Sequence, residues 1–274
     1  MSDHPDTHLY YHEAMNTTYS IRLRSCDQVT AKHVARELFE ELDGLEDKLS
    51  RYREGSDIAR INLLKKGDTL YISEECHKCL MLAAQAFADT GGLFDITLGR
   101  SIQKLKDSGE ADIANETGKL LLHPEIAAVT CQKEGRQIDL GGIGKGYALD
   151  HLKRLLSAWD IPSALLAAGN STLLAIGEQS WPIALVTSAA EAHKTHPLQD
   201  GAISVSGDAI QGQHIIHASI SHSSEDPQEP TAKVWVRHPS AALSDAYATA
   251  CYLMDTTLLE EFASNNADVI LIFP

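Results

Sequence analysis

One run of glycines in the sequence suits the binding of a phosphate group. Ile138–Asp150 reads IDLGGIGKGYALD, so that a predicted strand enters a turn with four glycines and a helix follows. Glycines let the backbone approach a ligand closely, and the free N–H groups at a helix start attract anions. Lys145 adds a positive charge at the same place. The pattern also fits a tight packing turn between a strand and a helix, and both interpretations stay open.

A second segment offers oxygen ligands for a cation. Asp245 and Thr249 lie four residues apart in Ser244–Ala250, which has helical character, so both side chains share one helix face. A carboxylate and a hydroxyl are ligands that Mg²⁺ accepts, usually together with waters and substrate phosphates. The alternative interpretation is that Asp245 caps the helix while Thr249 packs inside.

Two further segments place polar side chains in a loop and on a strand. Gly91–Gly99 holds Asp95 and Thr97 directly after a helix end, where loops often carry function, although an Asx turn would use the same residues. His214 and His217 stand three apart on a predicted strand. Because residues three apart on a strand face opposite sides, we do not expect both histidines to act on one ligand.

The helices and strands that must position these residues follow an order, helices early and strands later, that predicts an α+β fold. We expect a single large domain, residues 1–274. We expect helices clustered in the N-terminal half, a mainly antiparallel sheet system, and flexibility in residues 1–13. Apolar residues at helical or alternating spacing indicate the individual elements. The predicted helices are Thr30–Tyr52, Asp57–Leu64, Glu74–Asp89 and Ala242–Met254. The predicted strands are Thr18–Arg24, Thr69–Ile72, Ala164–Ala168, Thr172–Ile176, Ile183–Val186, Ala202–Val205, Ile215–Ile220 and Val234–Arg237, with a last one near the C-terminus.

Composition excludes some classes of protein and partner. Hydrophobic residues make up 43% and charged residues 22%, as in ordinary globular proteins, and no apolar run approaches the roughly 20 residues of a membrane helix. The start of the chain is polar and acidic, without the features of a signal peptide, so we expect a cytoplasmic protein. The net charge of -15 makes nucleic acid a poor partner, because phosphate binding needs a basic surface.

The five cysteines are scattered through the chain, which argues against a disulfide framework and fits a reducing compartment. Cys76 and Cys79 form an isolated CxxC pair without a second pair or a histidine cluster nearby. The pair therefore fits a helix with reduced thiols better than it fits a zinc site.

Taken in order, these segments resemble the ApbE family of flavin transferases, whose members move FMN from FAD onto a threonine of another protein. The resemblance covers roughly Ala14 to Asp255. Five segments carry it: Ala14–Thr17 (AMNT), Ser50–Ser56 (SRYREGS) with Asn62, Gly92–Thr97 (GLFDIT), Asp139–Asp150 (DLGGIGKGYALD) and Asp245–Ala250 (DAYATA).

The resemblance implies a magnesium-dependent FAD:protein FMN transferase with an ApbE, T-fold-like architecture. Its partners would be FAD and an acceptor flavoprotein with a target threonine, and AMP would be released. The implied FAD contacts are Met15, Tyr52, Leu93, Phe94, Asp95, Thr97, Lys145, Asp150 and Ser206. The implied Mg²⁺ ligands are Asp245, Thr249 and the carbonyl of Gly144. The implied catalytic residues are Asp245 and His214, which falls near a family histidine at the phosphate, and His217 is the alternative match.

Two segments depart from the family pattern. The family usually continues its histidine as Ile-Ile-Asp-Pro-Arg-Thr-Gly, whereas Ile215–Ser221 reads IIHASIS. The family's Ala-Gly-Gly-Asp is AGNS at Ala168–Ser171. Both departures fall on the side expected to hold flavin and acceptor, while the metal half is intact. Two alternatives therefore remain: an FAD pyrophosphatase, in which water replaces the threonine, and a non-catalytic FAD-binding or flavoprotein-assembly protein.

Overall fold

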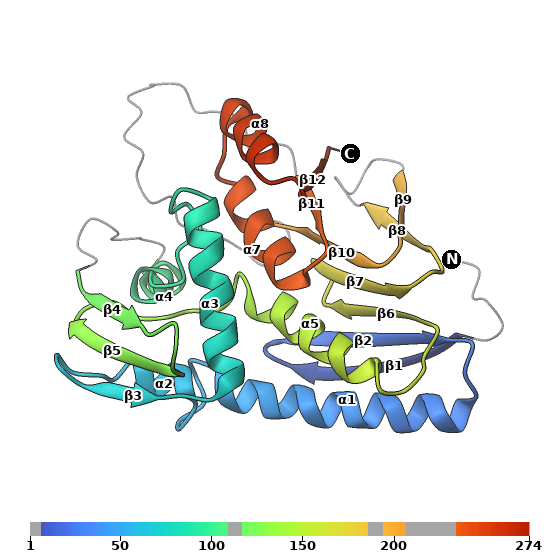
Figure 1. Ribbon diagram of the computed structural model, residues 1–274, viewed down its shortest axis with the longest axis horizontal. Coiled ribbons are helices and arrows are strands. Elements are labelled where there is room, and N and C mark those ends of the chain that lie inside the picture. Colours follow the sequence, from blue (N-terminus) through green and yellow to red (C-terminus); the bar gives the residue numbers. More distant parts are fainter. Residues whose placement is uncertain (1–6, 109–116, 186–193, 207–233, 274) are drawn as a thin grey trace.

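A seven-stranded sheet forms the centre of the molecule in the computed structural model, which describes residues 7–108, 117–185, 194–206 and 234–273 (Figure 1). The helices are α1 (Gln28–Leu49), α2 (Asp57–Ile61), α3 (Glu74–Asp89), α4 (Gly99–Ser108), α5 (Gly144–Leu156), α7 (Ala241–Cys251) and α8 (Thr256–Asn265). The strands are β1 (Thr7–Ala14), β2 (Thr17–Arg24), β3 (Thr69–Tyr71), β4 (Lys119–Leu122), β5 (Ala128–Lys133), β6 (Ser163–Ala168), β7 (Thr172–Gly177), β8 (Trp181–Leu185), β9 (Lys194–Leu198), β10 (Gly201–Val205), β11 (Trp235–His238) and β12 (Ile270–Ile272).

The central sheet has the order β1-β2-β6-β7-β10-β11-β12, and each neighbouring pair is antiparallel. Helices α1, α5 and α7 pack on one face of this sheet and share a large apolar core with it (Figure 1). A smaller apolar cluster includes residues of β8 and β9 together with side chains of the central strands. A separate sheet, β3-β5-β4, lies beside α2 and α3 (Figure 1). The predicted α+β fold with a mainly antiparallel sheet is thus confirmed.

Local signals explain why the helices form where they do. Asp27 caps α1 by accepting hydrogen bonds from the N–H groups of Val29 and Thr30. The buried side chains of α1 recur at helical spacing and face the core. Ser56 and Ser73 cap α2 and α3 in the same way as Asp27 caps α1. In the described residues, no helix combines the length and apolar character needed to cross a membrane.

Residues 7–13, part of the stretch 1–13 that we expected to be flexible, belong to β1. This strand pairs with β2 over its whole length, with Ala14 opposite Thr17. The two residues between the strands, Met15 and Asn16, have φ values of 49° and 57°. Two successive positive φ values are typical of the tight hairpin turn whose twist matches the twist of the strands. This turn therefore fixes the strand pairing.

The strand that the sequence predicts before the glycine turn is not formed. Residues 138–140 belong to no strand, and the nearest pairing is a single bridge between Gln137 and Leu98. The side chain of Asn62 takes the place of a neighbouring strand: its Nδ2 donates to the carbonyl of Ile138 at 3.0 Å, and its Oδ1 accepts from the N–H of Ile138 at 2.6 Å. A side-chain amide thus satisfies the backbone there.

Candidate functional site

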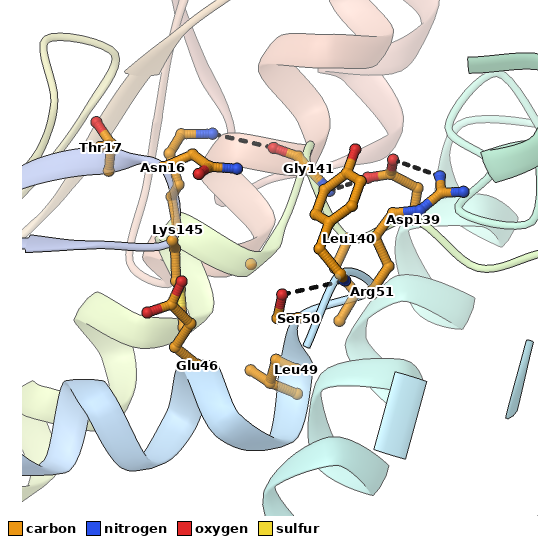
Figure 2. Close-up of a pocket in the computed structure, with 13 residues that line it drawn as sticks. Asn16, Thr17, Glu46, Leu49, Ser50, Arg51, Asp139, Leu140, Gly141 and Lys145 are labelled. Atoms are coloured by element: carbon orange, nitrogen blue, oxygen red, sulfur yellow. Dashed lines mark hydrogen bonds and ion pairs between the residues drawn. The ribbon is translucent and has the colours of Figure 1, made fainter. Parts of the chain in front are cut away.

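A cavity of about 430 Å³ opens where the end of α1, the β1–β2 turn and the glycine turn meet (Figure 2). The turn contributes residues 15–17, α1 and the residues after it contribute Glu46 and residues 49–52, and the glycine run contributes residues 139–141, Gly144 and Lys145. The structure therefore brings together four of the residues predicted for the site: Met15, Tyr52, Gly144 and Lys145.

Met15 reaches the cavity because of the hairpin turn in which it lies. The hydroxyl of Tyr19 donates a hydrogen bond to the Met15 sulfur at 3.3 Å. Tyr19 is buried, and its burial together with the nearby charges of Asp245 and Glu46 raises the pKa of its hydroxyl well above the ordinary value. Tyr19 therefore stays protonated and can keep donating to the thioether.

Tyr52, which follows α1, also lines the cavity. Its side chain is 59% exposed, and its hydroxyl donates to Gln103 at 3.4 Å. Its backbone N–H donates to the Ser50 hydroxyl at 3.2 Å. An exposed aromatic ring held at both ends offers a face on which a planar ligand can stack.

The glycine turn is closed by its own backbone and by Asp139. The N–H groups of Ile143 and Gly144 donate to the Leu140 carbonyl at 3.0 and 2.7 Å. The N–H of Gly141 donates to Asp139 Oδ1 at 2.8 Å. Helix α5 then begins at Gly144, and its N-cap residue, Ile143, makes no side-chain cap. The first turn of α5 therefore receives no hydrogen bond from the side chain of its own N-cap residue.

Arg51 is a site residue that the sequence analysis missed. Its Nη1 donates at 2.8 Å both to Asp139 Oδ2 and to the carbonyl of Gly99 (Figure 2). The side chains of Arg51 and Asp139 are only 10% and 9% exposed. Arg51 therefore anchors the Asp139 carboxylate, which in turn holds the glycine turn. The two residues are 88 positions apart, so no spacing rule could have linked them, although Arg51 lies inside the Ser50–Ser56 segment.

Helices α5 and α7 pack unusually close together at Gly146. A Cβ atom on this glycine would lie 2.1 Å from the carbonyl oxygen of Ala241. At this contact the N–H of Gly146 donates to Asp245 Oδ2 at 3.2 Å. In return, Asp150 of α5 accepts from the N–H of Ala241 at 2.9 Å and from the Ser240 hydroxyl at 2.6 Å. Each helix start thus receives a carboxylate from the other helix.

Asp150 therefore lies at the start of α7 and is not among the residues that line the cavity. The sequence resemblance implied an FAD contact for it, and the structure gives its carboxylate three hydrogen bonds within the protein instead.

Asp245 is the buried centre of the second predicted segment, with 5% exposure. Its Oδ1 accepts from the Thr172 hydroxyl at 3.1 Å, and its Oδ2 lies 3.4 Å from the Lys145 ammonium. Lys145 also donates to the carbonyl of Gly141 at 3.0 Å (Figure 2). The charged group that lines the cavity is therefore in direct contact with the carboxylate on α7.

Thr249 lies one turn after Asp245 on α7, as predicted, and its hydroxyl donates to the Asp245 carbonyl at 3.2 Å. That hydroxyl is also 3.2 Å from the place where a Cβ of Gly142 would stand, and the Phe94 ring is 3.0 Å from the same place. The absence of a side chain at Gly142 leaves room beside the Thr249 hydroxyl. Among the described residues, no three His, Cys, Asp or Glu side chains gather as a metal site, and the predicted set contains one carboxylate.

The loop with Leu93, Phe94, Asp95 and Thr97 packs beside the glycine turn but does not line the cavity. Asp95 Oδ1 accepts from the N–H of Thr97 at 2.8 Å, which is the Asx turn left open as an alternative. Asp95 Oδ2 lies 2.8 Å from Arg136 Nη1. The carbonyl of Ile96 in this loop accepts from the N–H of Asp139 at 2.8 Å, so the loop supports the start of the glycine turn.

The remaining predicted residues lie at or beyond the end of β10. Ser206 is half-buried, directly follows β10 and is not among the residues that line the cavity. His214, His217 and the predicted strand Ile215–Ile220 lie outside the described residues.

The sequence and the fold are similar to those of known proteins of one family. Residues 15–273 match the model of the ApbE family. The chain is 23% identical to the FAD:protein FMN transferase of Salmonella typhimurium (strain LT2) over 91% of this chain and 79% of that protein. A shorter match to the FAD:protein FMN transferase of Buchnera aphidicola is 25% identical and spans 53% of this chain and 47% of that protein. The crystal structure of the Pseudomonas stutzeri flavinyl transferase ApbE in its apo form superposes with a TM-score of 0.80 at 24% identity, covering 100% of this chain and 93% of that one.

Proposed function

The chain belongs to the ApbE family, and we propose that it is a magnesium-dependent FAD:protein FMN transferase. In this reaction the hydroxyl oxygen of an acceptor threonine attacks the phosphorus of the FMN half of FAD. The new bond joins that phosphorus to the threonine oxygen, and the bond to the AMP phosphate breaks. The threonine hydroxyl gives up its proton, and AMP leaves.

The observation that carries this proposal is the contact of Lys145, which lines the cavity at the start of α5, with the Asp245 carboxylate buried behind it. The Lys145 ammonium lines the cavity and contacts both the Gly141 carbonyl and Asp245. A positive charge beside a helix start favours a pyrophosphate, even in a chain with a net charge of -15. Met15 and Tyr52 offer a thioether and an aromatic face for the planar rings of FAD.

The donor atoms next to Lys145 fit Mg²⁺. Asp245 would supply a carboxylate oxygen, Thr249 a hydroxyl and Gly144 a backbone carbonyl, which are the oxygen ligands that a hard cation prefers. When bound, Mg²⁺ would neutralise the pyrophosphate charge and make AMP a better leaving group. The hydrogen bonds from Thr172 and Gly146 hold the Asp245 carboxylate in place for this task.

His214 is proposed to act at the phosphate, with His217 as the alternative. Because the two face opposite sides of a predicted strand, only one of them is expected to be needed. Separate His214→Ala and His217→Ala variants would identify the acting histidine. Only replacement of that histidine should slow AMP release while FAD binding persists.

One sequence feature favours a second candidate, an FAD pyrophosphatase or a non-catalytic FAD-binding protein. Ile215–Ser221 lacks the Asp-Pro-x-Thr-Gly pattern on the side expected to hold flavin and acceptor. A pyrophosphatase would release FMN and AMP without labelling a protein. A binding protein would hold FAD without releasing either product.

The test is a reaction with FAD, Mg²⁺ and the acceptor protein that the Salmonella relative modifies, followed by a denaturing gel and AMP measurement. The proposal expects a flavin-fluorescent acceptor band and AMP. Asp245→Asn should abolish both. Asp57→Asn is the matched control, because Asp57 is also a buried carboxylate, 8% exposed, that accepts from an N–H and a hydroxyl, both of Ser73. Asp57→Asn should retain the band.

A further inference from the structure

Ser204 has a buried hydroxyl whose presence the fold alone does not explain. Its side chain is 0% exposed, and its Oγ finds no hydrogen-bond partner among the described residues. A buried hydroxyl without a partner loses its bonds to water and gains none from the protein, which destabilises the folded state. Such a group calls for a separate reason to be there.

The position of Ser204 in the sheet places it under α7. On β10 its neighbours Ile203 and Val205 belong to the apolar cluster that includes β8 and β9, so Ser204 faces the opposite side, where α7 packs. Its cross-strand partners are Thr172 on β7 and Val236 on β11. Directly opposite residues of an antiparallel pair have Cβ atoms roughly 4.5–5.5 Å apart. Ser204 is thus the immediate neighbour of the threonine that bonds to Asp245.

Packing explains the small size of Ser204 but not its oxygen atom. Helix α7 is rich in alanine and lies close to the sheet, so the strand beneath it needs small residues. Ala202, two residues earlier on the same face of β10, meets this need without a hydroxyl. An alanine at position 204 would do the same.

Thr172 leaves an acceptor for the Ser204 hydroxyl. Thr172 donates its one hydroxyl proton to Asp245 Oδ1, so the lone pairs of its oxygen remain available. A bond from Ser204 would complete a chain from Ser204 through Thr172 to Asp245, in which each bond polarises the next. The chain would hold Oδ1 while Oδ2, now 3.4 Å from the Lys145 ammonium, turns to a cation.

We propose that Ser204 is a positioning residue for Asp245, acting through Thr172 when the site binds its cation. The proposal rests on the proposed use of Asp245 as a Mg²⁺ ligand. It explains why a serine stands where an alanine would pack.

The test compares Ser204→Ala with Ser163→Ala. Ser163 is also 0% exposed, and its hydroxyl has no partner among the described residues. It lies at the start of β6, opposite Arg24 and Gly177, and is not paired with Thr172. Without Mg²⁺, both variants should melt about 2–4 °C higher than the native protein, because each loses an unpaired buried hydroxyl. Calorimetric titration with Mg²⁺, alone and with FAD, should show binding weakened about tenfold or more in Ser204→Ala only.

A second variant tests the path through Thr172. Thr172→Val removes the hydroxyl at nearly constant shape, and adding Ser204→Ala to it should cause no further loss of Mg²⁺ affinity. Additive losses, native affinity in Ser204→Ala, or a lower melting temperature of that variant without Mg²⁺ would each overturn the inference. If the native protein binds no Mg²⁺ with or without FAD, the cation site of the proposed function is refuted, and the inference about Ser204 is refuted with it. Failure of Ser204→Ala alone leaves that site standing.

Discussion

Gly146→Ala tests the close contact between α5 and α7 around which the site is built. The new Cβ would stand 2.1 Å from the Ala241 carbonyl oxygen, whereas carbon and oxygen atoms normally approach to roughly 3.3 Å. The obstacle is backbone and cannot rotate away. The two helices must therefore separate by about 1 Å, and the 3.2 Å bond from the Gly146 N–H to Asp245 breaks.

The cost of Gly146→Ala follows from two unfavourable contributions and one favourable one. Forcing a methyl group into a packed contact costs about 1–3 kcal/mol, and losing a hydrogen bond to a charged group costs about 1.5–3 kcal/mol. Alanine returns about 0.5–1 kcal/mol because it forms helix more readily than glycine. The net loss is about 2–5 kcal/mol, which corresponds to a melting temperature lower by about 5–15 °C.

Thermal unfolding followed by circular dichroism measures this effect, and Gly44→Ala provides the matched control. Gly44 lies within α1, and nothing lies within 4 Å of its missing Cβ. The same substitution there should stabilise the protein by about 0.5–1 kcal/mol. If Gly146→Ala melts at or above the native temperature, α5 and α7 do not pack as described, and the reasoning about the Asp245 site is refuted.

Three further predictions concern the site, its pH dependence and its thiols. Gly142→Ala should weaken FAD and Mg²⁺ binding in equilibrium titrations, because its methyl would lie 3.2 Å from the Thr249 hydroxyl; Gly44→Ala should not. Burial lowers the pKa of His238, so the unfolded chain takes up a proton below about pH 6.5 before the folded protein does. Stability should therefore be complete above that pH and fall below it, and His238→Asn should flatten the fall in melting temperature. A thiol reagent should label half-buried Cys26 first, and mass spectrometry should find the other four cysteines, all buried, labelled only after unfolding.

Local signals in the sequence predicted helices α1, α2, α3 and α7, whereas α4 was missed. Helix α3 has the predicted bounds, Glu74–Asp89, because Ser73 caps it and a glycine pair follows it. Strand β1 was missed because polar and apolar residues do not alternate along its sequence, THLYYHEA, and because at the edge of the sheet most of its residues stay at least partly exposed. The strand pairing that reveals β1 is a property of the hairpin and not of the segment alone.

The candidate site could be predicted only as separate pieces. The glycine turn, and the shared helix face of Asp245 and Thr249, follow from residue type and spacing. What joins the pieces does not: the Gly146–Asp245 bond spans 99 positions and the Arg51–Asp139 pair spans 88. The exchange of carboxylates between α5 and α7 depends on how the helices cross, and tertiary packing decides that.

The central claim is that this site transfers FMN to a protein, and the ratio of products tests it most directly. AMP and acceptor-bound flavin should be measured in one reaction with FAD, Mg²⁺ and acceptor. The account predicts equal amounts of AMP and covalently bound FMN, and neither product from Asp245→Asn. AMP accompanied by an equal amount of free FMN, or FAD bound without either product while the Salmonella relative is active in the same assay, would contradict it.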